Sequence, residues 1–179
     1  MSCCSVLGLV FLVVTNLAII IAFATPYWVE YRGQINQGLW AYCQSDSCTW
    51  VFEDQYKAFS RTTIDVNSAW WIATLALMCF GLFLALFALL LATIALCCDC
   101  RGCNASHAIG GLLLLTFLSL GVAATVFGVC ANKYYNVETE MTFTTGKRFG
   151  WSFWLDAGAA GLALVTSFIY VIEGRGKSA

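Results

Sequence analysis

The sequence predicts a mainly α-helical membrane protein, in which a bundle of four transmembrane helices carries a small extracellular antiparallel β-sheet. Of the 179 residues, 60% are apolar and only 11% are charged, whereas a soluble domain is nearer half apolar and a quarter charged. Four apolar segments reach the roughly 20 residues that cross a bilayer as a helix. Polar segments between them contain short runs with strand character.

Loops of unequal length separate the apolar segments. The helices are expected at about 6–25, 69–96, 108–131 and 150–172. A long loop, 26–68, follows the first helix, a short loop, 97–107, follows the second, and a medium loop, 132–149, follows the third. We interpret residues 1–179 as a single domain whose long and medium loops share one side of the membrane, with both tails and the short loop on the other.

The first apolar segment has a second interpretation. Residues 22–24, Ala-Phe-Ala, resemble the cleavage site of a signal peptide, and cleavage there would leave three spans. The N-terminus has no Lys or Arg, however, and the apolar run is longer than a usual signal core. These two features favour a retained helix.

Cysteine placement orients the chain, because the positive-inside count is weak here. Cys43 and Cys48 lie in the long polar loop, as a disulfide in an oxidising compartment would. A second group lies against the opposite membrane face, where cysteines are often palmitoylated: Cys97, Cys98, Cys100 and Cys103. A zinc site and no modification are the alternatives, although one tight run closes poorly around zinc. We therefore expect cytoplasmic termini.

The long loop contains runs rich in aromatic and β-branched residues. They predict three antiparallel strands, at about 27–32, 39–42 and 49–52. Gly33, Asn36 and Gly38 are expected to break the first run from the second. In the medium loop, residues 137–143 alternate more weakly and are expected either to add a strand or to extend the third helix.

Several residues of the long loop resemble the signature of a known family. Trp28, Gly38-Leu39-Trp40, Cys43 and Cys48 are similar to the first-loop signature of the claudin superfamily. That group includes epithelial membrane proteins, peripheral myelin protein and the γ subunits of calcium channels and glutamate receptors. Arg61 falls where claudins tend to carry an arginine, and Phe149-Gly150-Trp151 also resembles the superfamily. The resemblance implies a four-helix bundle topped by an extracellular sheet.

The resemblance implies two alternative functions. The first is adhesion at tight or septate junctions of the plasma membrane, where sheets contact the same or related tetraspan proteins and form a paracellular barrier or pore. The second is an auxiliary subunit that regulates an ion channel or neurotransmitter receptor. The Trp28–Trp40 spacing is shorter than in vertebrate claudins, which is consistent with an invertebrate claudin-like protein. Residues 176–179 lack a PDZ-binding ending.

Other partners and activities are not expected. A net charge of −1 implies no nucleic-acid partner. The sequence has no metal-binding motif, nucleophile elbow or phosphate-binding glycine loop, so neither a cofactor nor an enzymatic activity is expected. The lipid bilayer is the one partner that composition alone requires.

Acidic residues and small residues are the remaining candidates for functional or packing roles. Four carboxylates of the long loop would favour cations if they lined a pore, and would otherwise be solvated: Asp46, Glu53, Asp54 and Asp65. Asp156 is the only charge inside a predicted span and is thus a functional candidate, expected to face the sheet or to snorkel to water. Closely spaced small residues predict helix packing within the bundle or a dimer face: Gly110-Gly111, Ala124 with Gly128, and Ala157 with Gly161.

Overall fold

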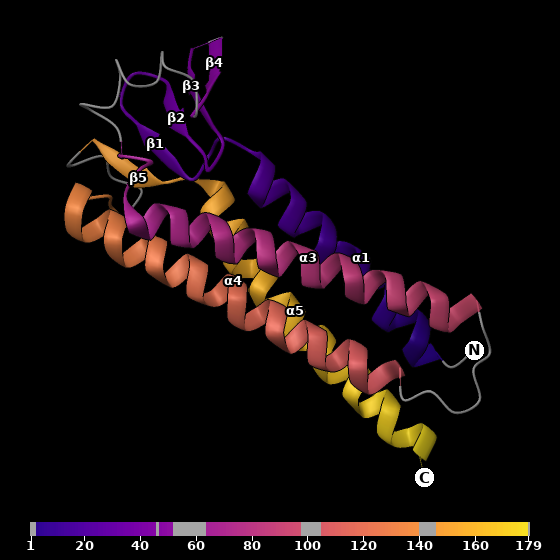
Figure 1. The fold of residues 1–179 in the computed structure, drawn as a ribbon. Coiled ribbons are helices and arrows are strands. Elements are labelled where there is room, and N and C mark those ends of the chain that lie inside the picture. The colour runs from indigo at the N-terminus through magenta and orange to yellow at the C-terminus, as the bar shows by residue number, and fades with distance from the viewer. Residues whose placement is uncertain (1–2, 46, 52–63, 98–104, 140–145, 179) are drawn as a thin grey trace.

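Four long helices lie side by side, and a small sheet covers one end of their bundle (Figure 1). The computed structural model describes residues 3–45, 47–51, 64–97, 105–139 and 146–178. The helices are α1 (Cys3–Ala24), α3 (Ala69–Cys97), α4 (Ala105–Tyr135) and α5 (Trp151–Ser178). All four are long and apolar enough to cross a membrane, which confirms the predicted helical bundle. Two of them, α4 and α5, continue beyond the predicted ends at residues 131 and 172.

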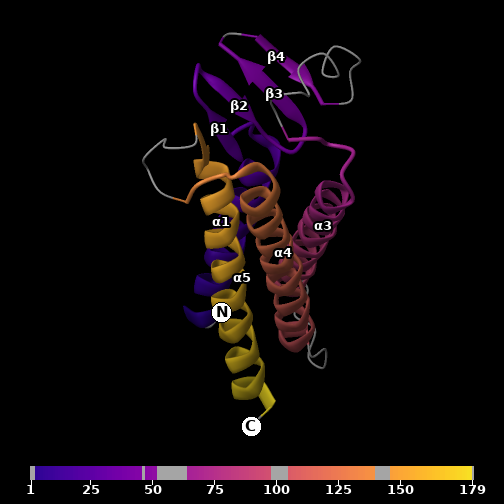
Figure 2. The same cartoon turned by 90° about the vertical axis from the view of Figure 1, so that its left-hand side faces the viewer.

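The two ends of the bundle differ. At the end of the bundle opposite the sheet, α1 begins, α5 ends, α3 ends and α4 begins (Figure 1). The sheet lies at the other end, where α1 and α4 end and α3 and α5 begin (Figure 2). The sheet and the outer ends of α1 and α5 therefore lie at opposite ends of the bundle.

Close packing joins neighbouring helices. Within the bundle α4 packs against α3 and α5, and α1 packs against α5 and α3. The Ser119 hydroxyl of α4 donates to Leu77 O of α3 at 2.8 Å, and the Ser167 hydroxyl of α5 donates to Gly110 O at 2.7 Å. A Cβ at Gly110 would lie only 3.2 Å from Ser167 O. Gly110 therefore serves packing within the bundle, one of the two predicted roles of the small residues.

Local sequence explains where the helices begin and end. Pro26 follows α1, and proline disfavours helical geometry in the residue before it. Ser68 begins α3 by accepting backbone bonds from Trp71 N at 3.0 Å and Ile72 N at 3.1 Å. After α4, Asn136 has φ 52°, the left-handed conformation that asparagine tolerates at a helix C-terminus.

The sheet has five antiparallel strands in the order β4-β3-β2-β1-β5. Their bounds are Val29–Tyr31, Ile35–Gln37, Ala41–Gln44, Ser47–Trp50 and Lys147–Phe149, for β1 to β5. The predicted antiparallel sheet is confirmed, but β2 occupies the segment that the sequence predicted as a break. The prediction failed there because glycines at positions 33 and 38 flank the strand closely, and a strand of three residues shows almost no alternation.

The strand from the medium loop also lies later than predicted. It is β5, which pairs with β1 so that Val29 opposes Phe149. Within the predicted segment 137–143, Glu138 makes an isolated bridge to Arg148, and residues 140–143 lie outside the described part of the chain. β5 joins the medium loop to the long loop in one sheet.

The main hydrophobic core combines side chains of the sheet with side chains of all four helices. Trp28, Trp71 and Phe127 are its largest side chains and are almost completely buried. Phe127 of α4 lies at its centre, with ring centroids 4.9 Å from Trp28 and 5.5 Å from Trp71. A smaller cluster around Leu12, Leu113 and Tyr170 fills the opposite end.

Candidate functional site

Trp28 anchors the first strand in the bundle. Its side chain is fully buried, and its indole N–H donates to Ala22 O of α1 at 2.7 Å. Its ring also packs edge-on against Phe127 of α4 and against Phe153 of α5, at 4.9 and 6.0 Å between centroids. Trp28 therefore contacts three helices and belongs to the core.

The Gly38-Leu39-Trp40 motif forms the turn between β2 and β3 and lies against the end of α1. A Cβ at Gly38 would lie 2.5 Å from Pro26 Cα, closer than real side chains approach. Leu39 is fully buried. Trp40 packs edge-on against Phe23 with ring centroids 5.1 Å apart, so it holds the sheet onto the end of α1.

The Phe149-Gly150-Trp151 segment links β5 to α5 and meets the same part of the chain. Gly150 N donates to Trp28 O at 3.0 Å, and a Cβ at Gly150 would collide with Tyr27 O. The ring of Trp151 lies 5.4 Å from that of Tyr27. Two motifs that are distant in sequence therefore contact neighbouring residues: the Gly38 motif lies against Phe23 and Pro26, and the Gly150 motif lies against Tyr27 and Trp28.

A buried polar network ties the sheet to the segment that leads into α3, and the sequence analysis missed it. Gln37 is fully buried. Its Nε2 donates to Ile64 O at 3.0 Å, and its Oε1 accepts from Tyr31 Oη at 2.6 Å and from Ile64 N at 3.2 Å. Buried polar groups require such partners. The only sign of this network in the sequence was Gln37 itself, a polar residue within a segment that was predicted as a break.

A charged pair joins β1 to β5. Arg148 Nε donates to Glu30 Oε2 at 2.7 Å, and its Nη2 lies 2.5 Å from the same oxygen. The residues next to this pair also make contact, since Lys147 Nζ lies 5.8 Å from the centre of the Tyr31 ring. The long and medium loops are therefore coupled by backbone pairing, by charge and by a cation–π contact.

Cys43 and Cys48 form a disulfide across the β3–β4 hairpin. They stand directly opposite each other in the register, with Cα atoms 4.1 Å apart. Ser45, in the turn between the strands, has φ 52°. The hairpin that ends the sheet is therefore closed both by the turn and by the disulfide.

The two edges of the sheet are unequal. At the β5 edge, Glu138 N donates to Lys147 O and Phe149 N donates to Glu138 O, both at 3.0 Å. In the described part of the chain, no strand pairs with the outer edge of β4. There the Trp50 side chain is 60% exposed. We call this strand, residues 47–50, the β4 edge.

The two described acidic candidates have contrasting surroundings. Asp65 is exposed, and its Oδ1 accepts from Asn67 N at 2.9 Å, in a turn that precedes α3. Asp156 of α5 is fully buried, and neither carboxylate oxygen has a hydrogen-bond partner among the described residues. The expectation that Asp156 snorkels to water is therefore wrong.

Several predicted residues lie outside the described part of the chain: Asp46, Glu53, Asp54, Arg61, Cys98, Cys100 and Cys103. Cys97 is the last residue of α3. Among the described residues, no three His, Cys, Asp or Glu side chains gather in a way that could hold a metal ion. Lipidation of the cysteine group and an ion-facing role of the acidic group stay predictions.

Family comparison agrees with this geometry. The model of the PMP-22/EMP/MP20/Claudin family matches residues 2–170, which include α1, α3, α4, most of α5, the sheet and both motif segments at the junction. No curated protein matches the chain. Because the family model covers nearly the whole sequence, this chain belongs to the PMP-22/EMP/MP20/Claudin family.

Proposed function

We propose that the chain is an adhesion protein of the plasma membrane that acts at cell–cell contacts through its sheet. The observation that carries this proposal is the contrast between the two edges of the sheet. The β5 edge is engaged by Glu138, whereas the β4 edge has no strand partner among the described residues and exposes Trp50.

An open strand edge of this kind favours contact with another protein. Its N–H and C=O groups, which no other described strand pairs with on this side, can accept a further strand. Tryptophan is also enriched among the residues that contribute most to protein interfaces. The β4 edge combines both properties, so we infer that it contacts a second copy of the chain or a related tetraspan protein.

Rigid attachment of the sheet supports the same function. Trp28 is buried among three helices, and Gly38 and Gly150 allow backbones to meet closely at the junction. The Gln37 network fixes the segment before α3 to the same sheet. A surface that is already ordered loses less conformational entropy when it binds. The junction motif therefore supports adhesion although it lies away from the contact surface.

In this proposal, the disulfide determines which end of the bundle faces the outside of the cell. Disulfides persist in oxidising compartments, so the sheet with Cys43 and Cys48 faces the outside of the cell. Both termini and Cys97 lie at the opposite end of the bundle (Figure 1) and would then be cytoplasmic. That placement suits palmitoylation of the cysteine group, because acyl transfer acts on cysteines next to the membrane.

The test compares two exposed aromatic residues. Cells expressing the tagged protein are mixed, and the signal at contacts between two expressing cells is divided by the signal on free membrane. We expect Trp50→Ser to lower this ratio at equal surface amount. Tyr134→Ser is the matched control, since Tyr134 is also 60% exposed but lies at the end of α4.

Two results would contradict the proposal. One is a wild-type protein that spreads evenly over contacting and free membrane. The other is an even distribution together with stoichiometric co-purification of an ion channel or receptor, which would establish the auxiliary-subunit alternative. An equal loss for Trp50→Ser and Tyr134→Ser would place the contact away from the β4 edge.

A further inference from the structure

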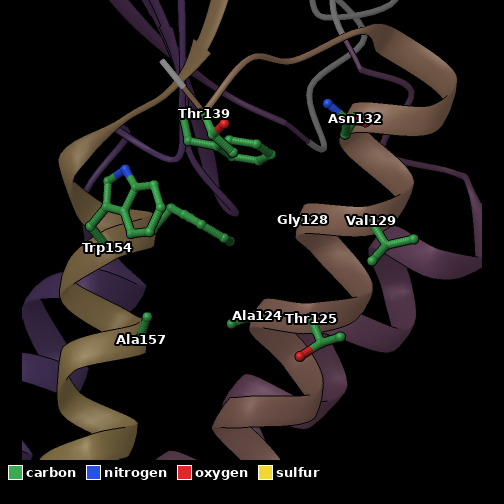
Figure 3. A pocket seen from close by; sticks show the side chains of 10 residues that line it. Ala124, Thr125, Gly128, Val129, Asn132, Thr139, Trp154 and Ala157 are labelled. Carbon is green, nitrogen blue, oxygen red and sulfur yellow. The ribbon is translucent and has the colours of Figure 1, made fainter. Parts of the chain in front are cut away.

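A groove of about 520 Å³ lies between α4 and α5, next to β5 (Figure 3). It exists because residues on both helices are small: Ala124 and Gly128 on α4, and Ala157 on α5. Even a single Cβ at Gly128 would lie 3.3 Å from the Phe153 ring. Its size falls within the roughly 300–1,000 Å³ that is typical of small-molecule sites.

The groove opens sideways onto the surface that faces the membrane. Val129 and Trp154, which line it, are 59% and 52% exposed. Both belong to helices that are long and apolar enough to span a bilayer. The groove is thus continuous with the lipid-facing surface of the bundle, and a molecule of the bilayer is its natural occupant.

Polar and apolar groups are separated along the groove. Asn132 and Thr139 lie at the end nearest the sheet, whereas Ala124 and Ala157 lie at the other end (Figure 3). The carboxamide of Asn132 donates to Val137 O at 2.9 Å, and no described residue donates to its oxygen. Near Ala124, the Thr125 hydroxyl is already used, because it donates to Gly121 O at 2.7 Å. The free polar groups therefore lie only at the sheet end.

No charged side chain lines the groove in the described part of the chain. A phosphate headgroup would need a cation or several donors at the polar end. A single hydroxyl group needs only an acceptor and a donor, which Asn132 and Thr139 provide. The polar end therefore fits an uncharged lipid better than a phospholipid.

Stacked aromatic rings form part of the groove wall. Phe149 and Phe153 have ring centroids 4.5 Å apart and planes inclined by 27°. Both side chains are largely buried, so the wall is fixed by the core. A rigid flat molecule loses less conformational entropy against such a wall than a flexible acyl chain does.

We propose that this groove binds one sterol, with its hydroxyl group at Asn132 and Thr139 and its fused rings between α4 and α5. The site is separate from the β4 edge and does not depend on the adhesive function.

The test uses photoactivatable probes on the purified full chain in phosphatidylcholine vesicles. One probe is a diazirine-bearing sterol and the other a diazirine-bearing phosphatidylcholine. We expect sterol labelling on peptides from α4 and α5 that unlabelled sterol competes away. Ala157→Leu places a larger side chain in the groove, where it would occupy the space of the sterol rings. We expect it to lower this labelling by about tenfold, because forcing extra volume into a filled space is costly. Gly158→Leu is the matched control, because a Cβ there meets nothing within 4 Å and Gly158 does not line the groove.

A second variant keeps the test independent of helix packing. Thr139→Val removes the hydroxyl at the exposed polar end at nearly constant volume, so it should lower sterol labelling without changing phosphatidylcholine labelling. Sterol labelling that is equal in Ala157→Leu, Gly158→Leu and the wild type would overturn the proposal. So would labelling by phosphatidylcholine at the same peptides with the same competition, which would mean ordinary surrounding lipid. A dimer that only Ala157→Leu dissociates, with no sterol labelling in the wild type, would assign the groove to a second copy.

Discussion

The indole N–H of Trp28 donates to Ala22 O at 2.7 Å, and this oxygen is the one that Pro26 leaves without a helical partner. In an α-helix, Ala22 O would accept from the backbone N–H of residue 26, but proline has none. The last helical bond of this turn is that of Thr25 N to Ile21 O at 3.1 Å. Pro26 thus ends α1, and the Trp28 indole supplies the hydrogen bond that the carbonyl of Ala22 would otherwise lack.

Replacing Trp28 by Phe should destabilise the fold through this one bond. Phenylalanine keeps an aromatic ring against Phe127 but leaves Ala22 O buried without a donor, which costs about 1–3 kcal/mol. The apparent melting temperature in detergent should fall clearly. Trp50→Phe is the control, because Trp50 is 60% exposed and exposed substitutions usually change stability by less than about 0.5 kcal/mol. Equal melting temperatures for the two variants would contradict the role assigned to the bond.

Gly38→Ala should be severely destabilising for a different reason. The added Cβ would lie 2.5 Å from Pro26 Cα, and backbone atoms cannot move away as a flexible side chain can, so a cost of about 1–3 kcal/mol is expected. Gly121→Ala is the control, since a Cβ there meets nothing within 4 Å and alanine favours the helix. Delivery to the cell surface should fall for the first variant and stay unchanged for the second. Normal delivery of Gly38→Ala would mean that the sheet can lie farther from α1.

The sequence was sufficient to predict the helices because about 20 consecutive apolar residues have almost no other stable form in a membrane. It predicted the sheet less well. Residues 35–37 were read as a break, and their assignment as a strand depends on pairing with both β1 and β3, which no local pattern reveals. The Gln37 network was missed because its partner Ile64 lies far along the chain. The only sign of the groove in the sequence was the set of small residues Ala124, Gly128 and Ala157. Small residues also occur where two helices pack closely, so they did not predict a groove.

The pair of Glu30 and Arg148 should make only a modest contribution to stability. Their side chains are 18% and 34% exposed, and partly exposed pairs are worth about 1 kcal/mol or less because water and salt screen them. We expect Arg148→Glu to destabilise the sheet and the double exchange Glu30→Arg with Arg148→Glu to recover part of the loss. Chemical denaturation at low and at high salt measures both effects. A double variant whose loss of stability equals the sum of the losses of Glu30→Arg and Arg148→Glu would show that the two charges act separately.

Stability should also fall at high pH because of Tyr42. This side chain of β3 is almost fully buried, and burial raises the pKa of Tyr42 above its usual value of 10.0. The folded state therefore holds the phenol proton more tightly than the unfolded state, so its contribution is complete below pH 10.0 and is lost as pH rises through the higher folded pKa. Tyr42→Phe should lose less stability than the wild type between neutral and strongly alkaline pH. Identical pH profiles would mean that Tyr42 ionises freely in the folded protein.

Orientation in the membrane can be tested with two glycosylation sites that lie at opposite ends of the bundle. The natural sequence Asn104-Ala105-Ser106 is a formal acceptor site whose last two residues begin α4, and α4 begins at the end of the bundle where α1 begins and α5 ends (Figure 1). Ser45→Asn creates a second acceptor site, because Ser47 follows two residues later. Ser45 is exposed with φ 52°, a conformation that asparagine adopts more readily than most residues, so the β3–β4 turn should survive the change.

Glycans are added only on the lumenal side, which becomes the outside of the cell. The proposed orientation therefore predicts no glycan on the wild-type protein expressed in mammalian cells. It also predicts a mobility shift for Ser45→Asn that a glycosidase removes. The opposite orientation predicts a shift of the wild type that Asn104→Gln abolishes, and no added shift for Ser45→Asn. That second pattern would place the sheet in the cytoplasm, where neither the disulfide nor contacts between cells could form.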